Sequence, residues 1–146
     1  AYWHNGHLFG TEIARGLDVF TMTESDFLSQ NEIAAASFKN PNAVENVQTQ
    51  RRIEWPAEPV VAKAYLDQLR RSESIDGMAA ERLAEALDSA ENAIGGELSD
   101  ADLSAQLRTL AESLPNAVTG ADTAITERRV AGLSETLTRI ADRVAP

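Results

Sequence analysis

The feature that most constrains the fold is a spacing of three and four residues between apolar positions in the second half of the chain. Leu103, Leu107, Leu110 and Leu114 follow this spacing, which places all four on one face of a helix. Three other stretches within residues 56–146 repeat it. Because short connections separate the stretches, neighbouring helices are expected to run antiparallel. The pattern predicts an up-down bundle of about four helices.

Helix-terminating and helix-capping residues bound these four stretches. The helix starts are predicted at Pro56, Asp76, Ser99 and Thr119. Gly95-Gly96 and Pro115 are expected to end the second and third helices. Asp102 and Asp122 stand three residues after the last two starts, where the acid of a capping box belongs. The apolar faces contain neither Glu nor His, which argues against a di-metal site in the bundle core.

Residues 1–22 have the pattern of short strands. Asn5-Gly6, between aromatic and apolar residues, indicates a two-residue hairpin turn, because both turn positions need a positive φ. A second turn is expected around residues 14–16, followed by an alternating run with Leu17 and Val19 on one face. Three short strands in meander order cannot bury both faces alone. We therefore expect a partner sheet, or helices, to lie over them.

Residues 23–55 form a connector that contains one short helix. Ser29 and Glu32 have the spacing of a capping box, and a helix over residues 33–38 is expected to follow. The predicted class is α+β, with a short N-terminal β meander followed by the helical bundle. Its three zones are residues 1–22, 23–55 and 56–146.

Charge and cysteine content exclude several function classes. Asp and Glu number 23 against 13 Lys and Arg, a formal net charge of −10. This argues against a nucleic-acid surface and against docking on an anionic membrane. No apolar run approaches the about 18 residues of a transmembrane helix. The absence of cysteine excludes disulfides, a thiol nucleophile and a thiolate metal site.

His4 and His7 are the candidate metal ligands. They flank the Asn5-Gly6 turn, so we expect them to be directly cross-strand on one face. Two imidazoles there can hold a metal if Glu12 or another chain supplies a third ligand. We favour the interpretation that both histidines are simply polar residues beside an exposed turn, because the side chains of Glu12 and His7 are expected to lie on opposite faces of the strand. No nucleophile elbow, phosphate loop or calcium loop is present, so the sequence predicts no catalytic residue, no cofactor and no enzyme.

Aromatic and branched residues are the candidate contacts with a partner. The predicted interaction or anchor residues are Trp3, Phe9, Val19, Phe20 and Trp55. The two tryptophans can also stack a sugar or a base. Trp55 directly precedes Pro56, however, and is expected to dock the bundle against the strands. Because both edges of the small sheet would present unpaired backbone groups, we expect the first strand or residues 17–21 to pair with a separate polypeptide.

Several runs of residues also carry a resemblance to a known family. The first is Tyr2-Trp3-His4-Asn5-Gly6-His7-Leu8-Phe9-Gly10-Thr11-Glu12-Ile13-Ala14-Arg15-Gly16-Leu17-Asp18-Val19-Phe20, followed by Leu28-Ser29-Gln30-Asn31-Glu32-Ile33. Asn46-Val47-Gln48-Thr49-Gln50, Trp55-Pro56 and Ala64-Tyr65-Leu66-Asp67-Gln68-Leu69 come later. The first two runs resemble the last blade of bacterial LVIVD-repeat β-propeller proteins, and the others are similar to the helical tail after that propeller. The resemblance extends to about residue 90.

The resemblance implies a location and a role. The family is exported, so we expect a secreted, periplasmic or cell-surface protein. The chain holds part of one blade, and the upstream propeller of the same protein, or another polypeptide, is expected to complete its sheet. The chain begins at Ala1 without a Met or a signal peptide, and we expect a trimmed or cleaved piece.

Three functions remain open on these grounds. The favoured one is a non-catalytic structural and interaction module, the C-terminal end of an exported scaffold and possible subunit of a larger surface or periplasmic assembly. The second is a hydrolase or metal-dependent enzyme whose site lies in propeller blades outside this chain. The third is a free-standing helical adaptor whose strands complete a partner's sheet.

Overall fold

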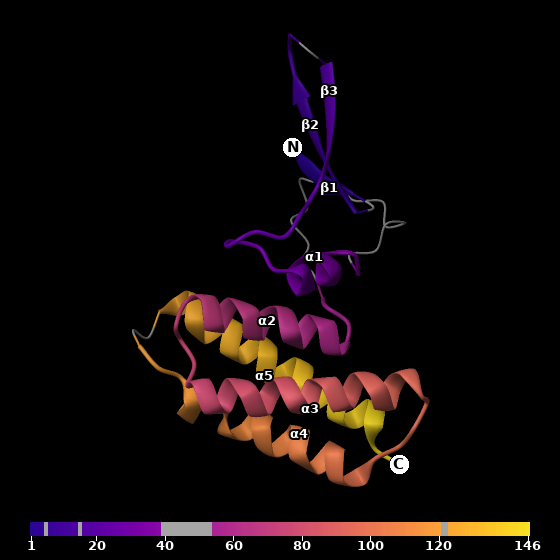
Figure 1. Cartoon of the computed structure of the whole chain (residues 1–146), viewed down its shortest axis with the longest axis vertical. Coiled ribbons are helices and arrows are strands. Elements are labelled where there is room, and N and C mark those ends of the chain that lie inside the picture. Colours follow the sequence, from indigo (N-terminus) through magenta and orange to yellow (C-terminus); the bar gives the residue numbers. More distant parts are fainter. Residues whose placement is uncertain (5, 15, 39–53, 121–122) are drawn as a thin grey trace.

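A small sheet and a helical bundle lie at opposite ends of the molecule, as the computed structural model in Figure 1 shows. The structure describes residues 1–4, 6–14, 16–38, 54–120 and 123–146. A three-stranded antiparallel sheet is followed by five α-helices, which confirms the predicted α+β class. Within the described ranges, none of the helices combines the length and the apolar character needed to span a bilayer.

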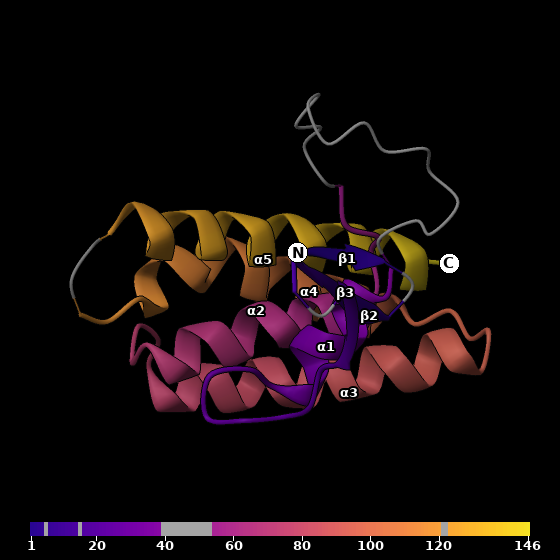
Figure 2. The ribbon, with the colours of Figure 1, turned by 90° about the horizontal axis from the view of Figure 1, so that it is seen from above.

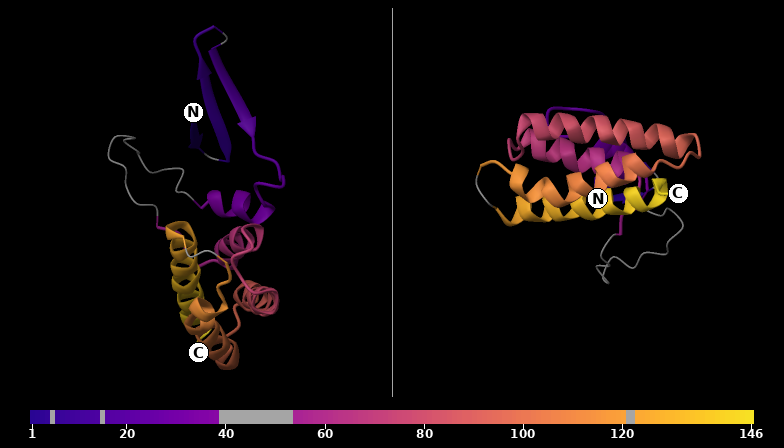
Figure 3. Two further views of the ribbon diagram at one scale, coloured as in Figure 1. Left: turned by 90° about the vertical axis from the view of Figure 1, so that its left-hand side faces the viewer. Right: turned by 90° about the horizontal axis from the view of Figure 1, so that it is seen from below.

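Four helices form the predicted antiparallel bundle. They are α2 (Pro59–Arg71), α3 (Gly77–Gly95), α4 (Ala101–Ser113) and α5 (Ala124–Val144), with the short 3-10 helix η1 (Leu114–Ala117) after α4. Figure 2 and Figure 3 show these four helices lying side by side. Their apolar faces meet in one core, whose largest fully buried side chains are Leu66, Leu69, Leu83, Leu87, Leu107, Leu114, Leu133, Leu137, Ile140 and Val144.

The helix caps correct three of the predicted starts. The cap at Asp76 is confirmed, since its carboxylate accepts a hydrogen bond from the Ala79 amide at 3.0 Å. The start of α2 was predicted at Pro56, but Pro59 is the first helical residue and Glu58 is its N-cap. A proline there costs the helix no hydrogen bond, because the first turn has no acceptor for its amide. The prediction of Ser99 as the start of α4 was one residue early.

Asp100 caps α4 in place of Ser99, with its carboxylate 2.9 Å from the Leu103 amide. The predicted start of α5 at Thr119 is also wrong, because Thr123 is the cap. Val118 forms a β-bridge with Ile75, which holds this stretch extended before the helix can begin. The Thr119 amide donates to the Ser74 carbonyl at 3.1 Å and fixes the same extended segment.

The connector contains helix α1 (Gln30–Ala36). Its capping box is confirmed: Ser29 Oγ accepts from the Glu32 amide at 3.2 Å, and the Glu32 carboxylate accepts from the Ser29 amide at 2.8 Å. The predicted range of residues 33–38 was too late, because a cap at Ser29 makes the next residue the first of the helix. Figure 1 shows α1 between the sheet and α2.

The sheet has the strand order β1-β2-β3, the predicted meander. The strands are β1 (Tyr2–His4), β2 (His7–Glu12) and β3 (Gly16–Thr21). His4 pairs with His7 across the first turn, as expected. Figure 1 shows the β2–β3 hairpin pointing away from the bundle.

Candidate interaction surface on the N-terminal sheet

Exposed apolar side chains gather at the N-terminal end of the molecule. Nine large apolar side chains are exposed in the described part of the chain, and six of them precede residue 39. These six are Ile13, Leu17, Val19, Phe20, Phe27 and Phe38. Because most of the exposed large apolar side chains lie at this end of the molecule, we take it as the candidate interaction surface.

The strand register divides the sheet into two faces. Phe9 pairs with Val19, so these two side chains share one face, which we call the Val19 face. Trp3 pairs with Leu8, and Leu8 pairs with Phe20, so these three share the opposite face, the Trp3 face. Both faces therefore carry apolar side chains, as in a sheet that is covered on both sides.

The Trp3 face connects the sheet to α1. The indole Nε1 of Trp3 donates a hydrogen bond to the Ala36 carbonyl at 3.2 Å. Farther along the strands, the Phe20 ring lies against Gly10, where an added Cβ would be 3.3 Å from Phe20 Cε2. Phe20 nevertheless stays half exposed at 50%. The hydrogen bond from Trp3 thus joins one end of this face to α1.

The Val19 face holds the two histidines. The rings of His4 and His7 lie 6.4 and 6.5 Å from the Phe9 ring, and His7 meets it edge-on. Thr21 Oγ1 lies 3.5 Å from His7 Nδ1. Glu12 pairs with Gly16 and belongs to the Trp3 face, away from both imidazoles. In the described ranges no three side chains of metal-binding type come together.

Trp55 lies at the junction of α1 and α2. It packs against Ala35, Val61 and Ala64, with Tyr65 beside it. Its carbonyl accepts a hydrogen bond from Arg139 Nη1 of α5 at 2.9 Å. We expected Trp55 to dock the bundle against the sheet. In the structure Trp55 packs against Ala35 of α1, and α1 in turn contacts the sheet through Trp3.

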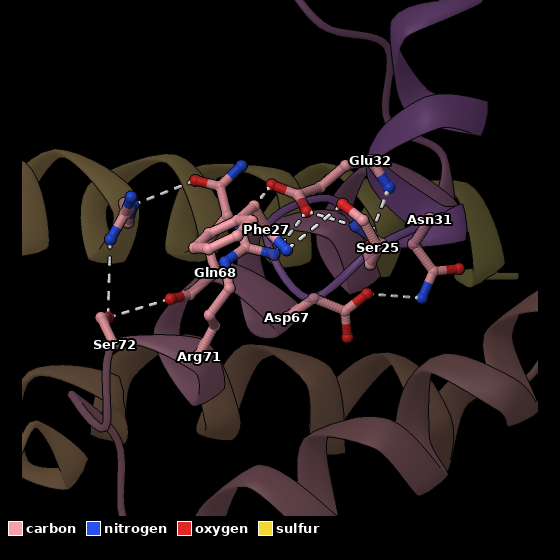
Figure 4. Close-up of polar contacts among 10 residues, drawn as sticks. Ser25, Phe27, Asn31, Glu32, Asp67, Gln68, Arg71 and Ser72 are labelled. Carbon is pink, nitrogen blue, oxygen red and sulfur yellow. Dashed lines mark hydrogen bonds and ion pairs between the residues drawn. The ribbon is translucent and has the colours of Figure 1, made fainter. Parts of the chain in front are cut away.

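A polar cluster also joins α1 to α2, as Figure 4 shows. Glu32 accepts two hydrogen bonds from Arg71, from Nη1 and from Nη2, each 2.8 Å long. Asn31 Nδ2 donates to Asp67 at 2.8 Å. Burial opposes the charged form of Glu32, but the bonds from Arg71 and the Ser29 amide outweigh it and lower the pKa of this carboxyl. The cluster holds α1 against α2, and α1 in turn holds the end of the sheet that contains Trp3.

Sequence reasoning did not find this cluster. The capping box marked Glu32, but its partner Arg71 is 39 residues away, and Asn31 and Asp67 are 36 residues apart. The one local signal for Arg71 was its place in the last turn of a helix. Basic residues are common there because they interact favourably with the helix dipole, so the signal does not point to Glu32.

Comparison with family models, with curated proteins and with solved structures finds no match for this chain.

Proposed function

We propose that this chain is a non-catalytic interaction module, in which a helical bundle carries a small sheet that joins another polypeptide. One observation supports this above the others: β3 leaves its large apolar side chains exposed, whereas the bundle helices bury most of theirs. Leu17, Val19 and Phe20 are 58%, 54% and 50% exposed. Leu107 and Leu137 in the bundle have no exposed surface.

The size of the sheet supports the same proposal. Three or more strands become stable when one face is covered by a core or a helix. Here the described hydrogen bond between α1 and the sheet lies at one end of the Trp3 face, from Trp3 to the Ala36 carbonyl. A partner that covers the rest of the sheet would supply the missing burial, at about 25 cal/mol for each Å² of apolar surface.

The junction between the sheet and the bundle suits a fixed attachment. Helix α1 is held to α2 by the Glu32–Arg71 pair and by the packing of Trp55. Residues 2–20 resemble a propeller blade, so the proposed partner is the upstream propeller of the same protein. The protein would then be an exported scaffold, secreted, periplasmic or on the cell surface.

Amide hydrogen exchange tests this proposal. The 146-residue chain is compared with the full-length gene product, purified from its source through a C-terminal tag, with exchange read by mass spectrometry. We expect fast exchange in β1, β2 and β3 of the isolated chain and slow exchange of the same amides in the full-length protein. The α3 and α5 amides serve as the internal control, because these helices already share a buried core within the isolated chain.

Two results would overturn the proposal. The first is a monodisperse monomer of the isolated chain whose strand amides already exchange slowly, because such a sheet would need no partner. The second is equally fast exchange of the strands in the full-length protein. The intact mass of the purified protein also shows whether the partner is the same polypeptide or a separate one.

A further inference from the structure

We propose that the outer edge of β3 accepts an added strand, and that this strand carries apolar residues at alternate positions with a basic residue opposite Asp18. The inference rests on the proposed function and deepens it, because it names the edge and the chemistry of the segment that binds there.

The strand order leaves two candidate edges, and their lengths differ. β2 is central, β1 has three residues and β3 has six. Very short edge strands are one of the devices by which proteins prevent pairing with other chains. In the described ranges, no strand pairs with the outer edge of β3. The longer free edge is therefore the better template for a new strand.

β3 carries one charged residue, Asp18, and lacks the other protective devices. Its residues are GLDVFT, with neither Lys nor Pro. Its register with β2 is one to one over all six positions, so no bulge twists the edge away. A six-residue edge without Lys, Pro or a bulge is a template for pairing with another strand.

The Val19 face defines the apolar positions of the incoming strand. Val19 lies beside Phe9 of β2, and Leu17 lies beside Thr11, so β3 continues an apolar row toward the open edge. Residues directly opposite on neighbouring strands have Cβ atoms about 5 Å apart. Apolar side chains of an added strand, opposite Leu17 and Val19, would extend this row and cover both.

Asp18 defines the basic position. It lies between Leu17 and Val19 and therefore on the Trp3 face. Its partner on β2 is Gly10, which has no side chain, so β2 supplies no directly opposite cation. A Lys or Arg opposite Asp18 on an added strand would form the favourable cross-strand charge pair.

Charge argues against a second copy of this chain as the occupant. Antiparallel pairing of two β3 strands about Asp18 would place two carboxylates directly opposite, which is destabilising. Each copy also carries a net charge of −10. A segment of different sequence, with the basic residue, fits the edge better.

The test uses the seven-residue peptide Val-Thr-Val-Lys-Val-Thr-Val, acetylated and amidated, added to the ¹⁵N-labelled 146-residue chain. With its Lys opposite Asp18, its valines fall on the Val19 face. We expect amide shift changes and slower exchange in β3, and no binding by the same peptide with alternate backbone amides methylated. The wild-type chain should prefer this Lys peptide over the same peptide with Glu in place of Lys. In the Asp18→Lys variant this preference should reverse: the Lys peptide should bind about two- to fivefold more weakly, and the Glu peptide more tightly by a similar factor.

Asp26→Lys is the matched control, since Asp26 is an exposed acid outside the strands and the variant has the same charge change. It should leave the preference for the Lys peptide unchanged. Equal affinities of Asp18→Lys for both peptides, or protection of β1 instead of β3, would overturn the inference. A peptide-resistant dimer in light scattering would overturn it in favour of a second copy.

The outcomes separate this inference from the proposed function. If the full-length protein protects the strands but the peptide leaves β3 unchanged, the interaction module stands and the choice of edge is wrong. If the peptide binds β3 but the strands exchange rapidly in the full-length protein, the edge is correct and the proposed partner is wrong.

Discussion

At the scale of single residues, Gly132 sets how closely α2 and α5 approach. An added Cβ at Gly132 would lie 2.6 Å from Cζ of Tyr65, which is well inside van der Waals contact. The Tyr65 ring therefore lies directly on the α5 backbone, and the absence of a side chain at Gly132 makes room for it. Tyr65 also borders Trp55 and α1, so this contact lies next to the junction that carries the sheet.

Gly132→Ala tests the close approach. Alanine favours helix by about 1 kcal/mol, but the overpacking against Tyr65 costs about 1–3 kcal/mol. We expect a net loss of about 1 kcal/mol in the free energy of unfolding, measured by urea denaturation. Gly95→Ala is the control, because nothing lies within 4 Å of its added Cβ. A Gly132→Ala variant more stable than the wild type would show that Tyr65 moves aside freely.

Leu107→Ala and Leu137→Ala test the bundle core. Both side chains are fully buried, so each change removes apolar contacts and leaves a cavity. We expect a loss of about 2–5 kcal/mol for each in the same denaturation experiment. Leu98→Ala, at a position that is 66% exposed, should change the free energy by less than about 0.5 kcal/mol. Losses under about 1 kcal/mol at both core sites would contradict the packing described.

At the scale of elements, α1 is the connection between sheet and bundle. It is only seven residues long, too short to be stable as an isolated helix. Its position depends on the capping box, on Ala35 packed against Val61 and Ala64, and on the Glu32–Arg71 pair. Loss of the ion pair is therefore expected to loosen α1 before it affects the bundle.

Glu32→Gln tests the ion pair through its pH dependence. The pKa of Glu32 is lowered in the folded protein, so its contribution is present above the unfolded pKa of about 4.3 and is lost as the pH falls through the lowered value. At pH 7 we expect the variant to exchange α1 amides faster, corresponding to about 1–2 kcal/mol of local opening. The difference from the wild type should disappear in acid.

The control is Asp88→Asn, which removes one partner of a surface ion pair with Lys63 and leaves α1 untouched. Its carboxylate is 67% exposed, and such pairs contribute little. α1 should exchange at the wild-type rate in this variant. A Glu32→Gln protein with wild-type α1 exchange at pH 7 would show that apolar packing alone holds the helix.

At the scale of the whole molecule, the bundle and the sheet differ in how far each depends on the rest. All residues of the main core lie at or beyond Ala57. The strands contribute none of them. The bundle therefore has its own core, and the sheet is an appended surface.

Removal of residues 1–28 tests this independence. We expect the shortened chain to keep its helical circular dichroism and to melt within a few degrees of the full chain, because no core contact is lost. Removal of residues 1–53 should lower the melting temperature more, because it takes away α1 and exposes Val61 and Ala64. Unfolding of the bundle in the chain that lacks residues 1–28 would show that the bundle depends on the sheet for its stability.

Local spacing was sufficient to predict the elements. Residues three or four positions apart form the four apolar faces, the cap at Asp76 and the capping box at Ser29. Each of these features is therefore determined by contacts within about one helical turn. The His4–His7 pairing follows likewise from one tight turn. The starts of α2, α4 and α5 were misplaced where several residues could cap and where a bridge from Ile75 to Val118 intervened.

The tertiary structure alone decided where these elements meet. Trp55 against α1, Tyr65 on Gly132 and Arg71 with Glu32 join segments that are far apart in sequence. An aromatic, a glycine or an arginine in a helix is compatible with many neighbours, and the choice depends on which faces the bundle leaves free. The sequence by itself therefore determined an α+β chain with a bundle and a small three-stranded sheet. Packing decided that α1 separates the two and leaves the β3 edge facing outward.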